Sequence, residues 1–118
     1  MTREMMLFIA KKSKDNDVLI VTNSNRAARR RKEEFKEFVL GALALPCREI
    51  KNSIFIFGEH RIVFCSPDAL RSWDSDYIGL VYLDFPDIIH SQKRNRCPKP
   101  QLLIDAVMDG RAFSEGTE

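Results

Sequence analysis

The chain has 118 residues, of which 44% are hydrophobic and 31% are charged, a composition typical of one globular domain of ordinary size. Its 19 basic and 17 acidic residues leave a net charge of +2, so the overall charge does not demand a nucleic acid or a membrane as partner. The three cysteines are widely separated and include no Cys-x-x-Cys pair, which argues against a structural zinc site and favours a reducing, cytoplasmic location.

Two apolar runs near the N-terminus each predict a strand. The first extends from Met5 to Ala10. It is too short for a membrane span or a signal peptide, so we expect no membrane contact. The second, VLIVT at residues 18–22, is a continuous β-branched run, which is typical of a strand covered on both faces of a sheet.

The next segment, NSNRAARRRKEEFKEFVLGALAL, predicts a long helix. Phe35, Phe38 and Val39 fall at spacings of three and four, so they share one apolar stripe of this helix. Pro46 stops the segment. The residues that can supply the N-cap are Asn23, Ser24 and Asn25.

The middle of the chain predicts a hairpin followed by a helix. Two short β-rich runs extend from Ile54 to Phe57 and from Arg61 to Cys65, with Gly58 in the turn between them. The segment SPDALRSW then begins a helix, because Ser66 can serve as its N-cap and Pro67 suits the first helical position.

The last third predicts a strand, a polar loop and a final helix. The strand YIGLVYLDF must leave the sheet near Asp84, because Pro86 cannot continue a central strand. The loop HSQKRNRCPKP follows, and the helix QLLIDAVMDG ends at Gly110.

Strands that alternate with helical segments indicate an α/β layer architecture. We expect a single three-layer domain over residues 1–112. Its sheet should be mostly parallel, with about five strands and one β-hairpin, and helices should pack on the sheet. Residues 113–118 are expected to form a frayed C-terminal tail.

Three segments in this order carry a family resemblance. The succession VLIVTNSNRAARRRKEEF, RIVFCSPDALRSW and DYIGLVYLDFPD resembles the interior of the first RecA-like motor domain of helicases and phage terminase ATPases, over residues 17–87. The resemblance implies that Thr22 and Arg26 grip a sugar-phosphate backbone and that the Ser-Pro turn at Ser66 makes a second backbone contact. It also implies that Asp84 stands where the family has an aspartate that organises magnesium.

Two departures from that family argue against an ATPase working alone. The sequence has no G-x-x-x-x-G-K-[ST] motif, so no Gly-rich loop and lysine cradle a triphosphate. Phe85 occupies the position of the glutamate that would orient the attacking water. The chain therefore resembles a truncated motor domain that lacks its Walker A loop, and we expect neither catalysis nor a cofactor.

The start of the long helix is strongly basic. A helix N-terminus binds phosphate through its free N–H groups, and cations there run against the helix dipole, which favours a negatively charged partner. In the alternative interpretation, three following glutamates neutralise the cluster and the arginines are ordinary solvated side chains. The candidate nucleic-acid-binding residues in this region and at the Ser-Pro turn are Thr22, Asn23, Ser24, Arg26, Arg29, Arg30 and Ser66.

A second basic region lies in the late polar loop. Its candidate residues are Lys93, Arg94 and Arg96. The loop and the arginine helix both leave the carboxyl edge of the predicted sheet, so they can form one electropositive surface. An ordinary solvated loop is the alternative.

Carboxylates near the end of the last predicted strand suggest a metal site. Asp84 and Asp87, helped by Asp68 or His90, offer the oxygen ligands that hard cations prefer. We favour the alternative that Asp84 caps a turn and Asp87 starts a short helix. The Glu-x-Lys sequence at Glu49 invites comparison with metal-dependent nucleases, but no convincing aspartate lies one strand earlier.

These patterns support three hypotheses of function. The first is a small non-catalytic accessory protein, encoded by a virus or mobile element, that binds DNA or RNA through the arginine-rich helix and the late basic loop. The second is a protein-interaction module, an inhibitor or adaptor that imitates part of a RecA-like motor. The third is a metal-dependent nuclease built on Asp84 and Glu49.

Overall fold

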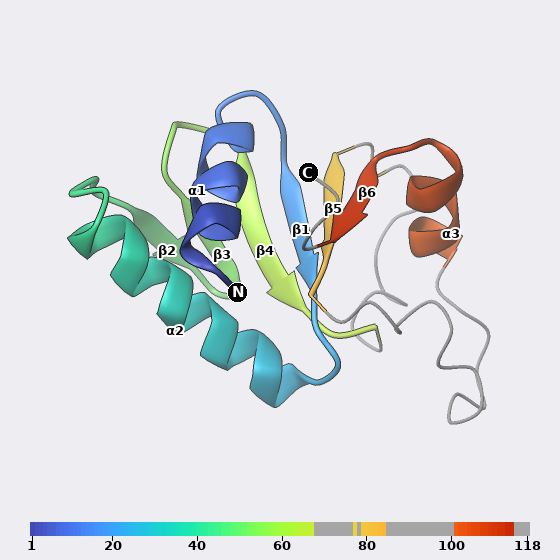
Figure 1. Ribbon diagram of the computed structural model, residues 1–118, viewed down its shortest axis with the longest axis horizontal. Coiled ribbons are helices and arrows are strands. Elements are labelled where there is room, and N and C mark those ends of the chain that lie inside the picture. The colour runs from blue at the N-terminus through green and yellow to red at the C-terminus, as the bar shows by residue number, and fades with distance from the viewer. Residues whose placement is uncertain (68–76, 78, 85–100, 115–118) are drawn as a thin grey trace.

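The structure is a computed structural model that describes residues 1–67, 77, 79–84 and 101–114 (Figure 1). A six-stranded sheet with the order β2-β3-β4-β1-β5-β6 forms its centre. The strands are β1 (Val18–Val21), β2 (Arg48–Ile50), β3 (Ser53–Phe55), β4 (Arg61–Cys65), β5 (Leu80–Leu83) and β6 (Ala112–Ser114). The helices are α1 (Arg3–Lys12), α2 (Asn25–Gly41) and α3 (Gln101–Met108).

The central strand β1 pairs in parallel with β4 on one side and with β5 on the other. β6 extends the parallel part beyond β5, whereas β3 and β2 add an antiparallel part beyond β4. The predicted α/β domain with a mostly parallel sheet and one hairpin is therefore confirmed.

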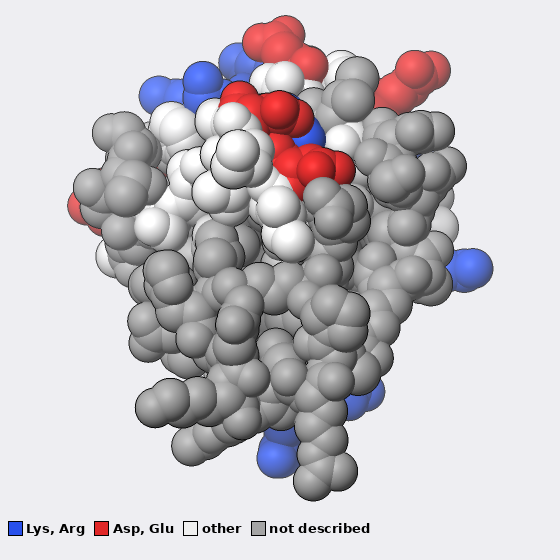
Figure 2. All heavy atoms as spheres, turned by 90° about the vertical axis from the view of Figure 1, so that its right-hand side faces the viewer, with Lys and Arg blue, Asp and Glu red and all other residues white. Residues whose placement is uncertain are grey.

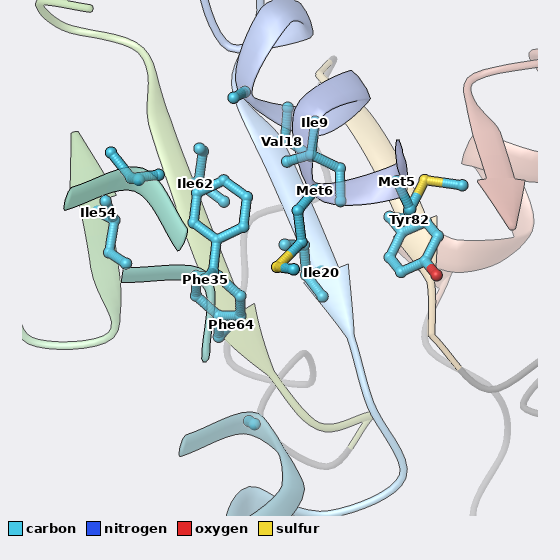
Figure 3. Packing of buried hydrophobic residues seen from close by; sticks show 13 residues of the cluster. Met5, Met6, Ile9, Val18, Ile20, Phe35, Ile54, Ile62, Phe64 and Tyr82 are labelled. Atoms are coloured by element: carbon cyan, nitrogen blue, oxygen red, sulfur yellow. The ribbon is translucent and has the colours of Figure 1, made fainter. Parts of the chain in front are cut away.

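Helices cover both faces of the sheet, with α1 and α2 on one face and α3 on the other. Side chains alternate along β1, so Val18 and Ile20 pack with α1 and α2, while Leu19 and Val21 pack with α3. In the first of these cores the ring of Phe35 lies 5.8 Å from that of Phe64 between ring centroids (Figure 3). This double coverage explains why the VLIV run is apolar throughout.

The apolar run from Met5 to Ala10, predicted as a strand, belongs instead to helix α1. Thr2 caps the helix, since its hydroxyl oxygen accepts a hydrogen bond from the backbone N–H of Met5 at 3.1 Å. The buried residues Met5, Met6, Ile9 and Ala10 form one helical stripe toward the sheet. The strand prediction was wrong because a short apolar run fits either periodicity.

Helix α2 begins where the sequence predicted, with Ser24 as its N-cap. Phe35 and Val39 are buried, and Phe38 is half-buried beside them. The helix ends at Gly41, ahead of Pro46.

The predicted hairpin is confirmed as β3 and β4, with Gly58 at a φ of 84° in the connection. The sequence did not predict β2, which pairs with β3 through a tight turn at Lys51 and Asn52. Lys51 has a φ of 54°, a left-handed conformation that is uncommon for a lysine.

The C-terminal part adds α3 and then β6. Gly110, at a φ of 72°, follows α3 and turns the chain back toward the sheet. β6 pairs with β5 over Ala112–Ser114, so the sheet continues past residue 112, where we expected the domain to end. Residues 68–73 of the helix predicted over SPDALRSW, and the polar loop at 90–100, lie outside the described residues. None of the described helices is long and apolar enough to cross a membrane.

Candidate functional site

Thr22, Ser66 and Asp84 directly follow three neighbouring parallel strands, β1, β4 and β5. Their backbones are linked, because Thr22 N–H donates to the Cys65 carbonyl at 2.9 Å and Asp84 N–H donates to the Val21 carbonyl at 3.0 Å. The structure thus brings these three predicted residues to one edge of the sheet. In open α/β folds the carboxyl ends of the strands are where ligands bind.

The side chain of Thr22 forms hydrogen bonds to the backbone at this edge of the sheet. Its side chain is fully buried, and its hydroxyl donates to the Ser24 carbonyl at 2.9 Å, with a longer contact of 3.4 Å to the Cys65 carbonyl. The hydroxyl is therefore used inside the protein, where it fixes the path of the chain from β1 into α2.

The beginning of α2 is joined to the end of β4. Ser24 Oγ accepts a hydrogen bond from the Ala27 N–H at 3.0 Å, which completes the N-cap. Asn25, the first helical residue, accepts a hydrogen bond from the Ser66 hydroxyl at 2.7 Å. Asn23 and Asn25 are exposed beside this junction. The helix start is consequently held in a fixed position at the sheet edge.

Arg26, Arg29 and Arg30 lie in the first two turns of α2 and are exposed. Their spacings of three and four place them together on the helix surface. Within the part of the chain that the structure describes, no side chain forms an ion pair with any of them. The first turn of α2 contains no acidic residue, so the helix itself supplies no carboxylate there to offset these cations at the positive end of its dipole.

The remaining cations of α2 form ion pairs. Arg31 Nε donates to Asp84 Oδ2 at 2.9 Å, and Arg31 Nη1 contacts Glu34 Oε2 at 3.3 Å. Burial lowers the pKa of the Arg31 guanidinium, but the hydrogen bond and charge of Asp84, with those of Glu34, outweigh burial and raise that pKa. The carboxylate of Asp84, a weak candidate for a metal ligand, thus forms an ion pair with Arg31.

Glu49 on β2 forms ion pairs with two other cations of α2. Its carboxylate lies 2.8 Å from Lys32 Nζ and 3.0 Å from Lys36 Nζ. These hydrogen bonds, first that of Lys32 and then that of Lys36, lower the pKa of Glu49. Glu49 and Asp84 are therefore neutralised by different cations, and neither contacts the other.

The described residues contain no cluster of three or more His, Cys, Asp or Glu side chains that could hold a metal ion. Asp68, Asp87 and His90 lie outside the described residues, as do the basic-loop candidates Lys93, Arg94 and Arg96. The geometry of the described part thus adds no support to the nuclease hypothesis.

A pocket of about 330 Å³ opens beside the start of α2. Its lining residues are Asn25, Ala28, Arg29, Asn52, Phe64 and Cys65. Sequence reasoning missed Asn52, and also the exposed Lys51 next to it. The Lys-Asn pair between two short β-rich runs could have predicted a tight turn here, since asparagine is common in such turns.

No family model, curated protein or solved structure matches the chain.

Proposed function

We propose that this protein is a small non-catalytic accessory protein that binds the phosphate backbone of nucleic acid through Arg26, Arg29 and Arg30. One contrast within α2 supports the proposal. Arg31, Lys32 and Lys36 each form an ion pair with a carboxylate, whereas the three arginines nearer the helix start form none with a described residue. The late basic loop, Lys93 to Arg96, supplies further contacts in this proposal.

The placement of these arginines is unfavourable for the isolated protein. Three cations near one another repel, and the helix dipole adds to the repulsion at this end of α2. A bound phosphate would reduce both the repulsion among the arginines and that from the helix dipole, because it is negatively charged and accepts hydrogen bonds from guanidinium groups and from the helix N-terminus. The resemblance to RecA-like motor domains points to the same partner at the same strand ends.

Fluorescence anisotropy with labelled oligonucleotides over a range of salt concentrations tests the proposal. Affinity should fall steeply with salt, and Arg26→Ala combined with Arg29→Ala should weaken binding to all sequences alike. For each phosphate that the variant no longer neutralises, the slope of log affinity against log salt should decrease by about one.

The matched control removes two other cations. Lys11 and Lys12 lie in the last turn of α1, at the opposite edge of the sheet from the start of α2 (Figure 1). Lys11→Ala with Lys12→Ala changes the net charge equally and should leave affinity nearly unchanged. Absence of binding at low ionic strength, or equal loss in both double variants, would overturn the proposal.

The second hypothesis, a protein-interaction module, is favoured by a different surface. Ile104, Val107 and Met108 on α3 are 41%, 43% and 80% exposed. Figure 2 views the side of α3 and β6 and shows uncharged side chains beside acidic ones. An exposed apolar stripe of this kind marks protein contacts. Ile104→Glu with Met108→Glu should abolish capture of a partner by the immobilised protein, and unchanged capture would contradict this function.

A further inference from the structure

The pocket beside α2 combines an apolar wall with a polar rim. Ala28 and Phe64 come from α2 and β4 and are buried. Cys65 completes the wall, and its burial raises the pKa of the thiol to about 12, so the thiol remains neutral. The wall therefore carries no charge and suits an uncharged, largely apolar group.

The rim carries hydrogen-bonding groups that the described protein leaves available. Asn25 uses its side-chain oxygen to accept from Ser66, which leaves its NH₂ group as a donor. The side chain of Asn52 forms no hydrogen bond with a described residue, and neither does that of Arg29. Two amides and one guanidinium thus border the pocket from α2 and from the β2–β3 turn.

The volume limits what can enter. About 330 Å³ is at the lower end of the range for small-molecule sites, roughly 300 to 1,000 Å³. A single aromatic heterocycle fits such a space. Side-chain amides are the groups that pair with the edges of nucleobases, and an apolar wall with an arginine at its rim is suited to stacking.

We propose that this pocket receives one unstacked nucleobase of a single-stranded nucleic acid. The inference rests on the proposed function, and Arg29 connects the two. Arg29 lines the pocket and also belongs to the exposed arginine group, so a base in the pocket and its adjoining phosphate would meet the same side chain. Bases within a duplex are stacked and cannot enter without being extruded.

Asn52 is the best position at which to test the pocket. It is exposed and lies in the β2–β3 turn, where its backbone carbonyl accepts from Phe64 N–H at 3.1 Å and its side chain forms no hydrogen bond with a described residue. Asn52→Ala therefore removes the amide while the hydrogen bond of the turn is retained. Asn16→Ala is the control, because Asn16 precedes β1 at the far edge of the sheet, where its side-chain NH₂ group donates to the Lys12 carbonyl at 3.3 Å and its backbone N–H donates to the same carbonyl at 3.1 Å.

The experiment compares four fluorescent probes by anisotropy: a single-stranded 12-mer, a blunt-ended duplex, a single-stranded backbone with abasic sites, and a mononucleotide. The intact single strand should bind roughly tenfold more tightly than the abasic strand. Asn52→Ala should remove most of that difference without changing affinity for the duplex, and Asn16→Ala should change neither.

The outcomes separate this inference from the function on which it rests. Equal binding of intact and abasic strands, unaffected by Asn52→Ala, would overturn the base pocket and leave phosphate binding in place. Binding of the mononucleotide without binding of any oligonucleotide would overturn both, and would instead assign the pocket to a free nucleotide.

Discussion

Arg31 in α2 and Asp84 after β5 are joined by an ion pair of 2.9 Å across the carboxyl edge of the sheet. The side chain of Asp84 is 10% exposed, whereas that of Arg31 is 32% exposed. Arg31 has a second partner in Glu34, but Asp84 forms no other side-chain hydrogen bond with a described residue. The aspartate therefore depends on the arginine more than the arginine depends on it.

Replacing either partner should accordingly have unequal effects on stability. Arg31→Met leaves a nearly buried carboxylate without its cation and should cost roughly 2 to 3 kcal/mol of unfolding free energy. Asp84→Asn keeps a polar acceptor and leaves Arg31 with Glu34 and water, so it should cost about 1 kcal/mol. Urea unfolding of both variants measures the difference, and a larger loss in Asp84→Asn would contradict this asymmetry.

Ser24 allows stability and binding to be separated. Ser24→Ala removes the N-cap of α2 and should lower the unfolding free energy by about 1 kcal/mol. Ser24→Asp restores a capping oxygen and should recover that stability, while its negative charge beside Arg26 should weaken nucleic-acid binding. Thermal unfolding and anisotropy on the same samples test this, and parallel changes in both quantities would count against it.

The lowered pKa of Glu49 predicts a pH-dependent contribution to stability. A carboxylate whose pKa is lower in the folded state stabilises the fold at pH values above the unfolded pKa, about 4.3 for glutamate. That contribution is lost as pH falls through the lowered folded value. The stability difference between wild type and Glu49→Gln should therefore be present at neutral pH and disappear in acid.

Urea unfolding at several pH values measures this difference. Glu37→Gln is the control, because Glu37 is an exposed residue of α2 that forms no ion pair with a described residue. Its difference from wild type should stay near zero. A Glu49→Gln difference that persists unchanged in acid would show that Lys32 and Lys36 do not stabilise the carboxylate.

Among the glycines that the structure describes, Gly79 is the one where an added side chain would collide with neighbouring atoms. A Cβ at this position would collide with the hydroxyl of Tyr77 and the backbone carbonyl oxygen of Asp17. That oxygen accepts the Leu80 N–H at the start of β5, so Gly79→Ala should destabilise the fold by roughly 1 to 3 kcal/mol.

Gly41 provides the comparison for Gly79. It ends α2, and a Cβ at this position would meet no neighbouring group within 4 Å, while alanine favours helix by up to about 1 kcal/mol. Gly41→Ala should therefore leave the unfolding temperature unchanged or raise it relative to wild type, whereas Gly79→Ala should lower it. Equal unfolding temperatures for the two variants would contradict the assignment of the clash.

The sequence predicted those elements that have a long apolar run or two independent sequence features. β1 has a continuous apolar run, and α2 has a capping residue with an apolar stripe. β2 and β6 were missed because three residues show no clear alternation. β6 is held by tertiary contacts, since the ring of Phe113 lies 5.3 Å from those of Phe8 and Tyr82.

The candidate site was predictable only where it follows parallel strands. Thr22, Ser66 and Asp84 could be placed together from the rule that such strand ends share an edge. Asn52 reaches the same edge because β3 runs antiparallel to β4, a pairing that fixes where its turn lies. The partners of Arg31 and Glu49 likewise depend on tertiary packing, which residue spacing along α2 does not reveal.

The position of β1 in the sheet bears on how the protein folds. Val18 pairs with Ile62 and with Leu80, so both borders of this apolar strand stay open until much later segments have been synthesised. Closing such distant contacts slows folding and leaves unpaired strand borders exposed to other chains. Helix α1, whose hydrogen bonds are local, can form first and shield one face of β1 during that interval.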